Sequence, residues 1–217
     1  MKVSGWGRFP RIDSEISHPR DEHAVAAQVL SQRTLIPRGA GRSYGDSSLN
    51  RAAIISRDGL NRILAFDETT GDMIAEAGVL LADIVALWTP RGWFPPVTPG
   101  TKFVTLGGMV ASDVHGKNHH SAGSFAHHLA WIDLIIANGD IVRCSPTSEP
   151  DLFWATCGGM GLTGFILRIA FRLIPVETPY MRQRTLRAEN LTHAIQLFEE
   201  NASWAYSVGW IDCMARV

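Results

Sequence analysis

The chain has 217 residues, of which 46% are hydrophobic, and its formal net charge at pH 7 is −1. This length and composition indicate a globular protein with a sizeable core, in one large domain or two small ones. The balanced charge argues against a nucleic-acid partner. The apolar runs fall short of the roughly 18 residues of a transmembrane segment, and the N-terminus lacks the apolar core of a signal peptide, so we expect a cytoplasmic protein.

In the first half of the chain, helical and extended patterns alternate. The residues after Asp21 place alanine, valine and leucine at helical spacing, with Pro19 and Asp21 as start signals. Apolar extended runs then flank a glycine-rich loop, and two more flank a turn that ends at Gly71. The predicted elements of this half are a helix over 21–33, strands over 34–37, 52–56, 62–67 and 72–77, and a helix over 80–90.

The second half begins with the segment 93–100, whose three prolines favour a rigid, extended backbone leading to Gly100. Asn138-Gly139 then joins two apolar runs and is a strong signal for a hairpin turn. The predicted elements are strands over 131–137 and 140–144, a helix over 151–157, a strand over 164–176, a helix over 191–201 and a strand over 204–213. Pattern breaks near Gly71 and near 175–179 divide the chain into 1–70, 71–177 and 178–217.

Two glycine-rich segments carry the strongest functional signal. The first is Pro-Arg-Gly-Ala-Gly-Arg-Ser-Tyr-Gly-Asp at 37–46, and the second is Thr-Leu-Gly-Gly at 105–108. Glycine-rich loops can bring backbone N–H groups against a phosphate, and Arg42 beside Tyr44 suits phosphate and ring recognition. Either loop alone could be an ordinary connector. Together they indicate a nucleotide-type cofactor that lies between two small α/β units.

A third glycine pattern, Gly-Met-Gly-Leu-Thr-Gly at 159–164, matches the dinucleotide-binding pattern G-x-G-x-x-G. That pattern must follow a strand and begin a helix, whereas this segment follows a predicted helix and begins a predicted strand. We therefore interpret it as a tight turn. The chain contains neither a nucleophile elbow nor a Walker loop, so hydrolase and kinase functions have no support.

The histidines and cysteines do not predict a metal site. Glycines interrupt the histidine-rich segment 115–128, and no carboxylate or cysteine there completes a ligand set. We interpret His115 and Lys117 as polar groups that point into a cavity. The cysteines are odd in number and far apart, which favours reduced, buried thiols at Cys144, Cys157 and Cys213.

Several of these segments, taken in order, resemble the FAD-binding domain of the vanillyl-alcohol-oxidase type flavoproteins, and within that family the decaprenylphosphoryl-ribose 2-oxidases. The resemblance runs from about Gly5 to about Asp212 and rests on 5–8, 38–46, 99–101, 115–124, 152–156 and Gly158-Gly159. It implies an α+β fold: a PCMH-type FAD-binding domain of two α/β subdomains (1–70 and 71–177), then the start of a substrate domain (178–217).

The resemblance also implies roles for particular residues. It implies non-covalent FAD, although His115 occupies the position at which related oxidases sometimes bond covalently to the flavin. The implied substrate-facing residues are Tyr44, Lys117 and Trp210, and His115 or Lys117 would assist proton transfer. The implied cofactor-binding residues are Arg38, Gly39, Ala40, Gly41, Arg42, Ser43, Tyr44, Gly45, Asp46, Ser47, Gly100, Thr105, Leu106, Gly107, Gly108, Ser112, Asp113, Val114, His115 and Ile166.

The implied reaction is the oxidation of a sugar hydroxyl to a ketone by an FAD-dependent oxidoreductase. The expected substrate is the 2-hydroxyl of a polyprenylphosphoryl ribose, a cell-wall arabinan precursor, and a partner short-chain reductase would complete its epimerisation. Two alternatives stay open: an FAD-dependent oxidase of a free sugar, alditol or aldonolactone, and a non-catalytic flavin- or nucleotide-binding module.

Two further expectations concern the chain as a whole. Members of the family continue well beyond the length of this chain, so the resemblance implies a truncated substrate domain, weak FAD binding and little or no turnover by the chain alone. A lipid-linked substrate also raises the alternative that the cytoplasmic protein lies peripherally on the inner face of the membrane.

Overall fold

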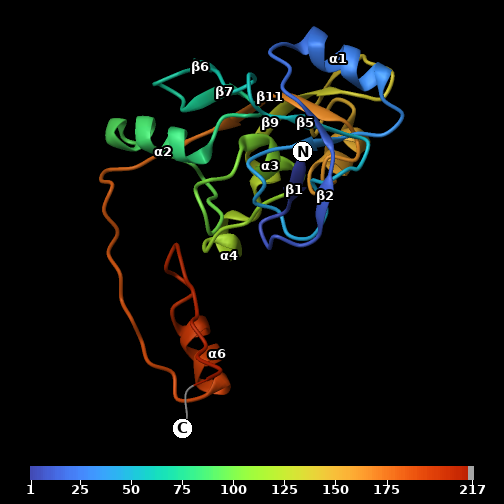
Figure 1. Cartoon of the computed structure of the whole chain (residues 1–217). Helices are drawn as coiled ribbons and strands as arrows, with labels where there is room; N and C mark the ends of the chain where they lie inside the picture. Colours follow the sequence, from blue (N-terminus) through green and yellow to red (C-terminus); the bar gives the residue numbers. More distant parts are fainter. Residues whose placement is uncertain (215–217) are drawn as a thin grey trace.

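The computed structural model describes residues 1–214 and shows a mixed α/β fold with two main sheets (Figure 1). The smaller sheet is parallel, with strand order β3-β5-β4, and the helix α1 lies close to it in both views. The side chain of Asp21 accepts a hydrogen bond from the Ala24 N–H and caps this helix, as predicted. The elements are β3 (Glu15–Ser17), α1 (Glu22–Ser31), β4 (Ile36–Arg38) and β5 (Ala53–Ser56).

The larger sheet is antiparallel, with strand order β10-β9-β11-β7-β6. Both predicted hairpins are confirmed, β6–β7 and β9–β10, and Gly139 has a φ of 85° in the second turn. The predicted strand over 164–176 is observed as β11 and the short β12. The strands are β6 (Ile63–Phe66), β7 (Asp72–Glu76), β9 (Leu129–Ile135), β10 (Ile141–Cys144) and β11 (Phe165–Arg172).

Short elements complete the fold around these sheets. The predicted helices over 80–90, 151–157 and 191–201 are confirmed as α2, α5 and α6. The pairs β1–β2 and β8–β12 form two-stranded antiparallel sheets. The bounds are β1 (Lys2–Ser4), β2 (Arg11–Asp13), α2 (Leu81–Trp88), η1 (Thr89–Arg91), β8 (Trp93–Phe94), α3 (Leu106–Ala111), α4 (His119–Ala122), η2 (Phe125–His128), α5 (Pro150–Thr156), β12 (Ile174–Pro175) and α6 (Leu191–Glu200).

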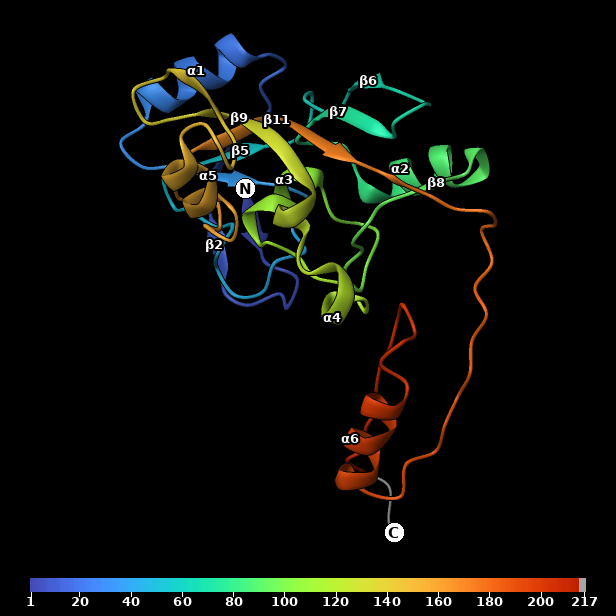
Figure 2. The same cartoon turned by 180° about the vertical axis from the view of Figure 1, so that it is seen from behind.

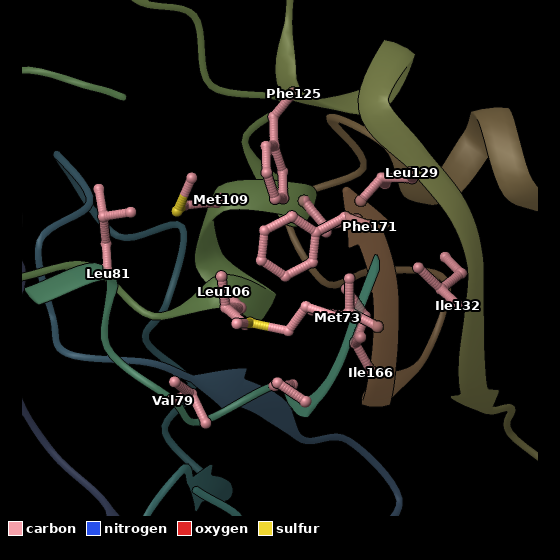
Figure 3. Packing of buried hydrophobic residues seen from close by; sticks show 14 of the residues in the cluster. Met73, Val79, Leu81, Leu106, Met109, Phe125, Leu129, Ile132, Ile166 and Phe171 are labelled. Carbon is pink, nitrogen blue, oxygen red and sulfur yellow. The ribbon is translucent and has the colours of Figure 1, made fainter. Parts of the chain in front are cut away.

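The main hydrophobic core packs α3 against the larger sheet. Figure 3 shows Leu106 of α3 close to Met73 of β7, Met109 on the side of α3 toward Leu81, and the rings of Phe125 and Phe171 close together. These two ring centroids are 5.4 Å apart. A second cluster, which includes Val25, Ile55 and Phe165, joins α1 and β5 to β9 and β11. The two clusters hold both sheets in one fold.

Two predictions about local structure are wrong. The segment 105–108 is not a loop, because Thr105 caps α3 and the next three residues form its first turn. The predicted strand over 204–213 is not formed; those residues make turns and irregular structure after α6. A strand must pair with a neighbouring strand. Residues 204–213 follow α6, and α6 stands apart from both sheets at the end of an extended segment (Figure 2). Hydrogen bonds from the Ser207 N–H to the Lys117 carbonyl, and between His120 and the Trp204 carbonyl, join this region to the segment around α4.

Candidate functional site

A cleft of about 690 Å³ lies between the loops of the smaller sheet and the larger sheet. Its walls come from the loop after β4, the segment before α3, α3 itself and the turn before β11. Most of the residues implied to bind the cofactor meet there. Those that line the cleft are Arg38, Gly39, Ala40, Gly41, Arg42, Ser43, Tyr44, Ser47, Gly100, Thr105, Gly107, Gly108, Ser112, Val114 and Ile166.

The loop over 39–46, which we call the first glycine loop, presents its backbone to the cleft. Among residues 1–214, none of the N–H groups from Gly39 to Asp46 donates a hydrogen bond to another protein atom. Gly41 and Gly45 have φ values of 67° and 58°, which glycine adopts without strain. Unpaired N–H groups in a concave loop are suitable donors for a phosphate. The first glycine loop therefore has the properties of an anion-binding loop.

Arg38 supports this loop from within. One guanidinium nitrogen donates to the Ser4 carbonyl at 2.7 Å, and the other donates to the Ser48 hydroxyl at 2.9 Å. A Cβ at Gly41 would collide with the same guanidinium group. Burial lowers the pKa of Arg38, and within the described residues no carboxylate forms an ion pair with it. An anion in the cleft would offset this half-buried positive charge.

The start of α3 contributes to the cleft in a different way. The Leu106 N–H donates to the Val79 carbonyl at 2.9 Å, and the Gly107 N–H donates to the Ala77 carbonyl at 2.8 Å. The Gly108 N–H donates to the Thr105 hydroxyl at 3.0 Å. These donors are therefore already paired. The glycines here instead allow close approach, since a Cβ at Gly107 would lie 2.9 Å from the Ala77 Cβ.

Several implied site residues are not among the described residues that line the cleft. Gly45, Asp46 and Leu106 lie in lining segments but do not themselves line it. The carboxylate of Asp113, whose φ is 38°, accepts a hydrogen bond from the Ala126 N–H at 2.9 Å and so fixes the chain before His115.

Of the residues implied to contact the substrate or to transfer its proton, some line the cleft and others do not. Tyr44 lines the cleft, and its ring meets that of Trp6 edge-on with centroids 5.8 Å apart. His115 and Lys117 are exposed and outside the lining, although Val114, which precedes His115, belongs to it. Trp210 is 93% exposed and also lies outside the lining. The structure brings one of the three implied substrate residues to the cleft.

Sequence reasoning missed part of the wall. The turn over 159–164 follows α5 and precedes β11, as predicted, but three of its residues line the cleft. The glycine pattern itself was the signal, and the wrong strand–helix context led us to set it aside. Trp6 belongs to the segment 5–8 that contributes to the resemblance, but no role was predicted for it. The unpredicted lining includes Trp6, Ser48, Met160, Gly161, Gly164 and Phe165.

Within the described part of the chain, no three or more His, Cys, Asp or Glu side chains come together in an arrangement that could hold a metal ion. None of the helices formed by residues 1–214 has both the length and the apolar character needed to cross a membrane.

Comparison with known proteins supports the interpretation of the cleft as a cofactor site. A model of the FAD-binding domain family matches residues 18–145. Decaprenylphosphoryl-beta-D-ribose oxidase of Mycolicibacterium smegmatis is 39% identical over 99% of this chain and 49% of its own length. Human Delta(24)-sterol reductase is 32% identical over 53% of this chain and 22% of its own length. A putative D-arabinono-1,4-lactone oxidase of Neurospora crassa is 25% identical over 67% of this chain and 26% of its own length.

The chain thus spans about half the length of the first of these relatives and smaller shares of the other two. These matches confirm the resemblance found in the sequence and the cofactor it implied. The chain belongs to the FAD-binding domain family, whose cofactor is FAD.

Proposed function

We propose that the protein is an FAD-dependent oxidoreductase that oxidises a sugar hydroxyl to a ketone, with the 2-hydroxyl of a polyprenylphosphoryl ribose as its substrate. The observation that carries the proposal is the cleft of about 690 Å³ with the unpaired N–H groups of the first glycine loop along one wall. The similarity to an oxidase of decaprenylphosphoryl-beta-D-ribose supports the choice of substrate.

In this proposal, two α/β subdomains, 1–70 and 71–177, hold FAD non-covalently between them, and 178–217 begins a substrate domain. The first glycine loop binds the diphosphate through its backbone N–H groups, while the Ser43 hydroxyl donates to the Ser48 hydroxyl at 3.0 Å. The α3 segment packs closely beside the flavin without donating from its first turn, because those N–H groups are paired within the protein. Ile166 closes the wall on the β11 side.

The bound cofactor supplies the acceptor for the hydride that leaves the sugar carbon. The residues of the chain orient the sugar and take the hydroxyl proton. Tyr44 and Trp6 offer aromatic surface for the sugar at the cleft, and Val114 places His115 next to it. We assign the proton acceptor to His115 or Lys117, which both lie on the exposed segment beyond Val114.

The absorption spectrum tests the proposal in two stages. The protein in its full natural length, purified, mixed with FAD and passed through a desalting column, should keep a flavin absorption band. Anaerobic addition of a polyprenylphosphoryl ribose should then bleach that band, whereas free alditols and aldonolactones should not. A protein that keeps no flavin contradicts the cofactor assignment, and one bleached only by a free sugar contradicts the substrate.

The similarity to a putative D-arabinono-1,4-lactone oxidase favours a second candidate, an oxidase of a free sugar, alditol or aldonolactone. Bleaching by these compounds alone would establish it. A flavin band that no substrate bleaches would point to a non-catalytic binding module. The partner reductase and peripheral contact with the inner face of the membrane belong to the first candidate and are tested only after its substrate is established.

A further inference from the structure

The N-terminal segment Ser4–Trp6, which we call the clasp, lies directly against the first glycine loop. The Trp6 N–H donates to the Ser43 carbonyl at 2.9 Å, and the Ser4 carbonyl accepts from Arg38 at 2.7 Å. The Trp6 ring meets the Tyr44 ring edge-on. The clasp precedes residues 18–145, the part of the chain that matches the FAD-binding domain family, so that match assigns it no role.

Gly5 sets how closely the clasp approaches the loop. The residue is buried, and a Cβ built on it would collide with the Gly45 carbonyl oxygen and lie 2.9 Å from the Ser43 carbonyl oxygen. Both of these oxygens belong to the backbone, so no side-chain rotation can relieve the collision. Any larger residue at position 5 must displace either the clasp or the first glycine loop.

The clasp is held from its other side as well. Ser4 is the last residue of β1 and pairs with Arg11 of β2. The N-terminal amino group donates to the Ser14 carbonyl at 2.8 Å. Arg38 joins the clasp to the far end of the loop, since its guanidinium also donates to Ser48. The β1–β2 pair, the clasp and Arg38 therefore hold the first glycine loop through contacts at Ser43, Tyr44 and Ser48.

We propose that the clasp is a positioning element for FAD: it holds the first glycine loop in the shape that turns its N–H groups toward the cofactor diphosphate. Gly5 and Arg38 act through the loop, and neither is a catalytic residue. This inference rests on the proposed cofactor site. It predicts that loosening the clasp weakens FAD binding, because the loop must then be ordered each time the diphosphate binds. Losses of affinity of this kind appear mainly as faster dissociation.

A pair of glycine substitutions tests the clasp. Gly5→Ala introduces the collision, whereas a Cβ at Gly7, two residues later, meets nothing within 4 Å. Gly7→Ala therefore controls for the change in backbone entropy. FAD release is followed by the recovery of free-flavin fluorescence, at a temperature where circular dichroism shows each protein folded. We expect FAD to leave Gly5→Ala about tenfold faster than the wild-type chain, and Gly7→Ala within about twofold of it.

Arg38→Lys provides an independent test if Gly5→Ala does not fold. Lysine keeps the positive charge but lacks the guanidinium fork that reaches Ser4 and Ser48 together. Arg38→Lys should also speed FAD release. Expressed as a free energy, this change should exceed the change in the free energy of unfolding of the apo protein in urea. If FAD left a folded Gly5→Ala variant or the Arg38→Lys variant at the wild-type rate, the proposed positioning role of the clasp would be overturned. Failure of the wild-type protein in its full natural length to bind FAD would instead overturn the proposed function.

Discussion

The first glycine loop and the start of α3 are both glycine-rich, yet they use glycine for opposite purposes. In the loop, the N–H groups from Gly39 to Asp46 have no acceptor among residues 1–214. In α3, the N–H groups of Leu106, Gly107 and Gly108 are all paired within the protein. The loop leaves N–H donors available to a ligand, whereas the glycine at the start of α3 allows the helix to pack closely against Ala77.

This difference shows that glycine content alone does not indicate what a segment contributes to a cofactor site. What a glycine-rich segment contributes depends on whether its backbone N–H groups already have hydrogen-bond partners within the protein. The two segments also touch, because a Cβ at Gly39 would collide with the Thr105 hydroxyl. Substitutions in the loop should therefore change FAD affinity first, and substitutions in α3 should change stability first.

The largest effect is expected at Gly107, on the α3 side. A valine there would push against Ala77, since a Cβ alone would lie 2.9 Å from the Ala77 Cβ. Overpacking of this kind should lower the free energy of unfolding by about 3 kcal/mol, measured by urea denaturation of the apo protein. Gly100→Val is the matched control because a Cβ at Gly100 meets nothing within 4 Å. Equal stability of the two variants would show that α3 is not tightly packed.

The next effect is expected at Gly41, in the loop. Gly41→Ala places a side chain at a φ of 67° and against the Arg38 guanidinium, so the loop must change shape. FAD affinity, measured by fluorescence titration, should weaken about tenfold, or about 1.4 kcal/mol. Gly45→Ala has a similar φ of 58° but no neighbour within 4 Å, and it controls for backbone strain. Equal losses in the two variants would exclude the Arg38 contact as the cause.

Thr105 lies where the two regions meet. Its hydroxyl accepts a hydrogen bond from the Gly108 N–H and caps α3. Thr105→Ala should lower the free energy of unfolding by about 1 kcal/mol, and Thr105→Ser should restore most of it. A serine variant as unstable as the alanine variant would mean that the methyl group of Thr105, and not its hydroxyl, matters for stability.

The smallest effect is expected at alkaline pH and comes from two cysteine thiols in and against the core that includes α3. Cys144 is buried in the core that includes α3, and Cys157 packs partly buried against that core; burial raises their pKa values to about 11 and about 12. Both thiols ionise more readily when unfolded, so the free energy of unfolding should fall as the pH rises above their ordinary pKa. The fall should stay below about 1 kcal/mol between about pH 8 and about pH 9.

Replacing both cysteines with alanine provides the control for that pH dependence. The doubly substituted protein should lose the alkaline decrease even if its absolute stability is lower. The first glycine loop, 39–46, contains no cysteine, so its contribution to FAD binding should not follow this titration. An unchanged pH profile in the doubly substituted protein would assign the decrease to other groups.

The sequence predicted the elements whose signals are local. Asn138-Gly139 indicated its hairpin because the turn requires a positive φ, and the spacing after Asp21 indicated α1. The helix at 106–111 was missed because glycine disfavours helices, and the packing of Gly107 on Ala77 that compensates is a contact between distant segments.

The same reason explains what was missed at the site. Most of the cofactor-binding residues that the resemblance implied line the cleft, but the resemblance could not show that Arg38 binds Ser4 and Ser48 and so supports the loop. The turn over 159–164 was judged by the elements around it, while its place in the cleft depends on the fold. The alternation at 204–213 suggested a strand, although within residues 1–214 no strand pairs with this segment.

The most direct test compares the binding of FAD, riboflavin and ADP to the same protein, by fluorescence titration for the flavins and by competition for ADP. Riboflavin lacks the diphosphate that the first glycine loop is proposed to hold. We expect FAD to bind at least about tenfold more tightly than riboflavin, and ADP to displace it. Equal affinities for FAD and riboflavin, with no competition from ADP, would contradict the assignment of the unpaired N–H groups to the diphosphate.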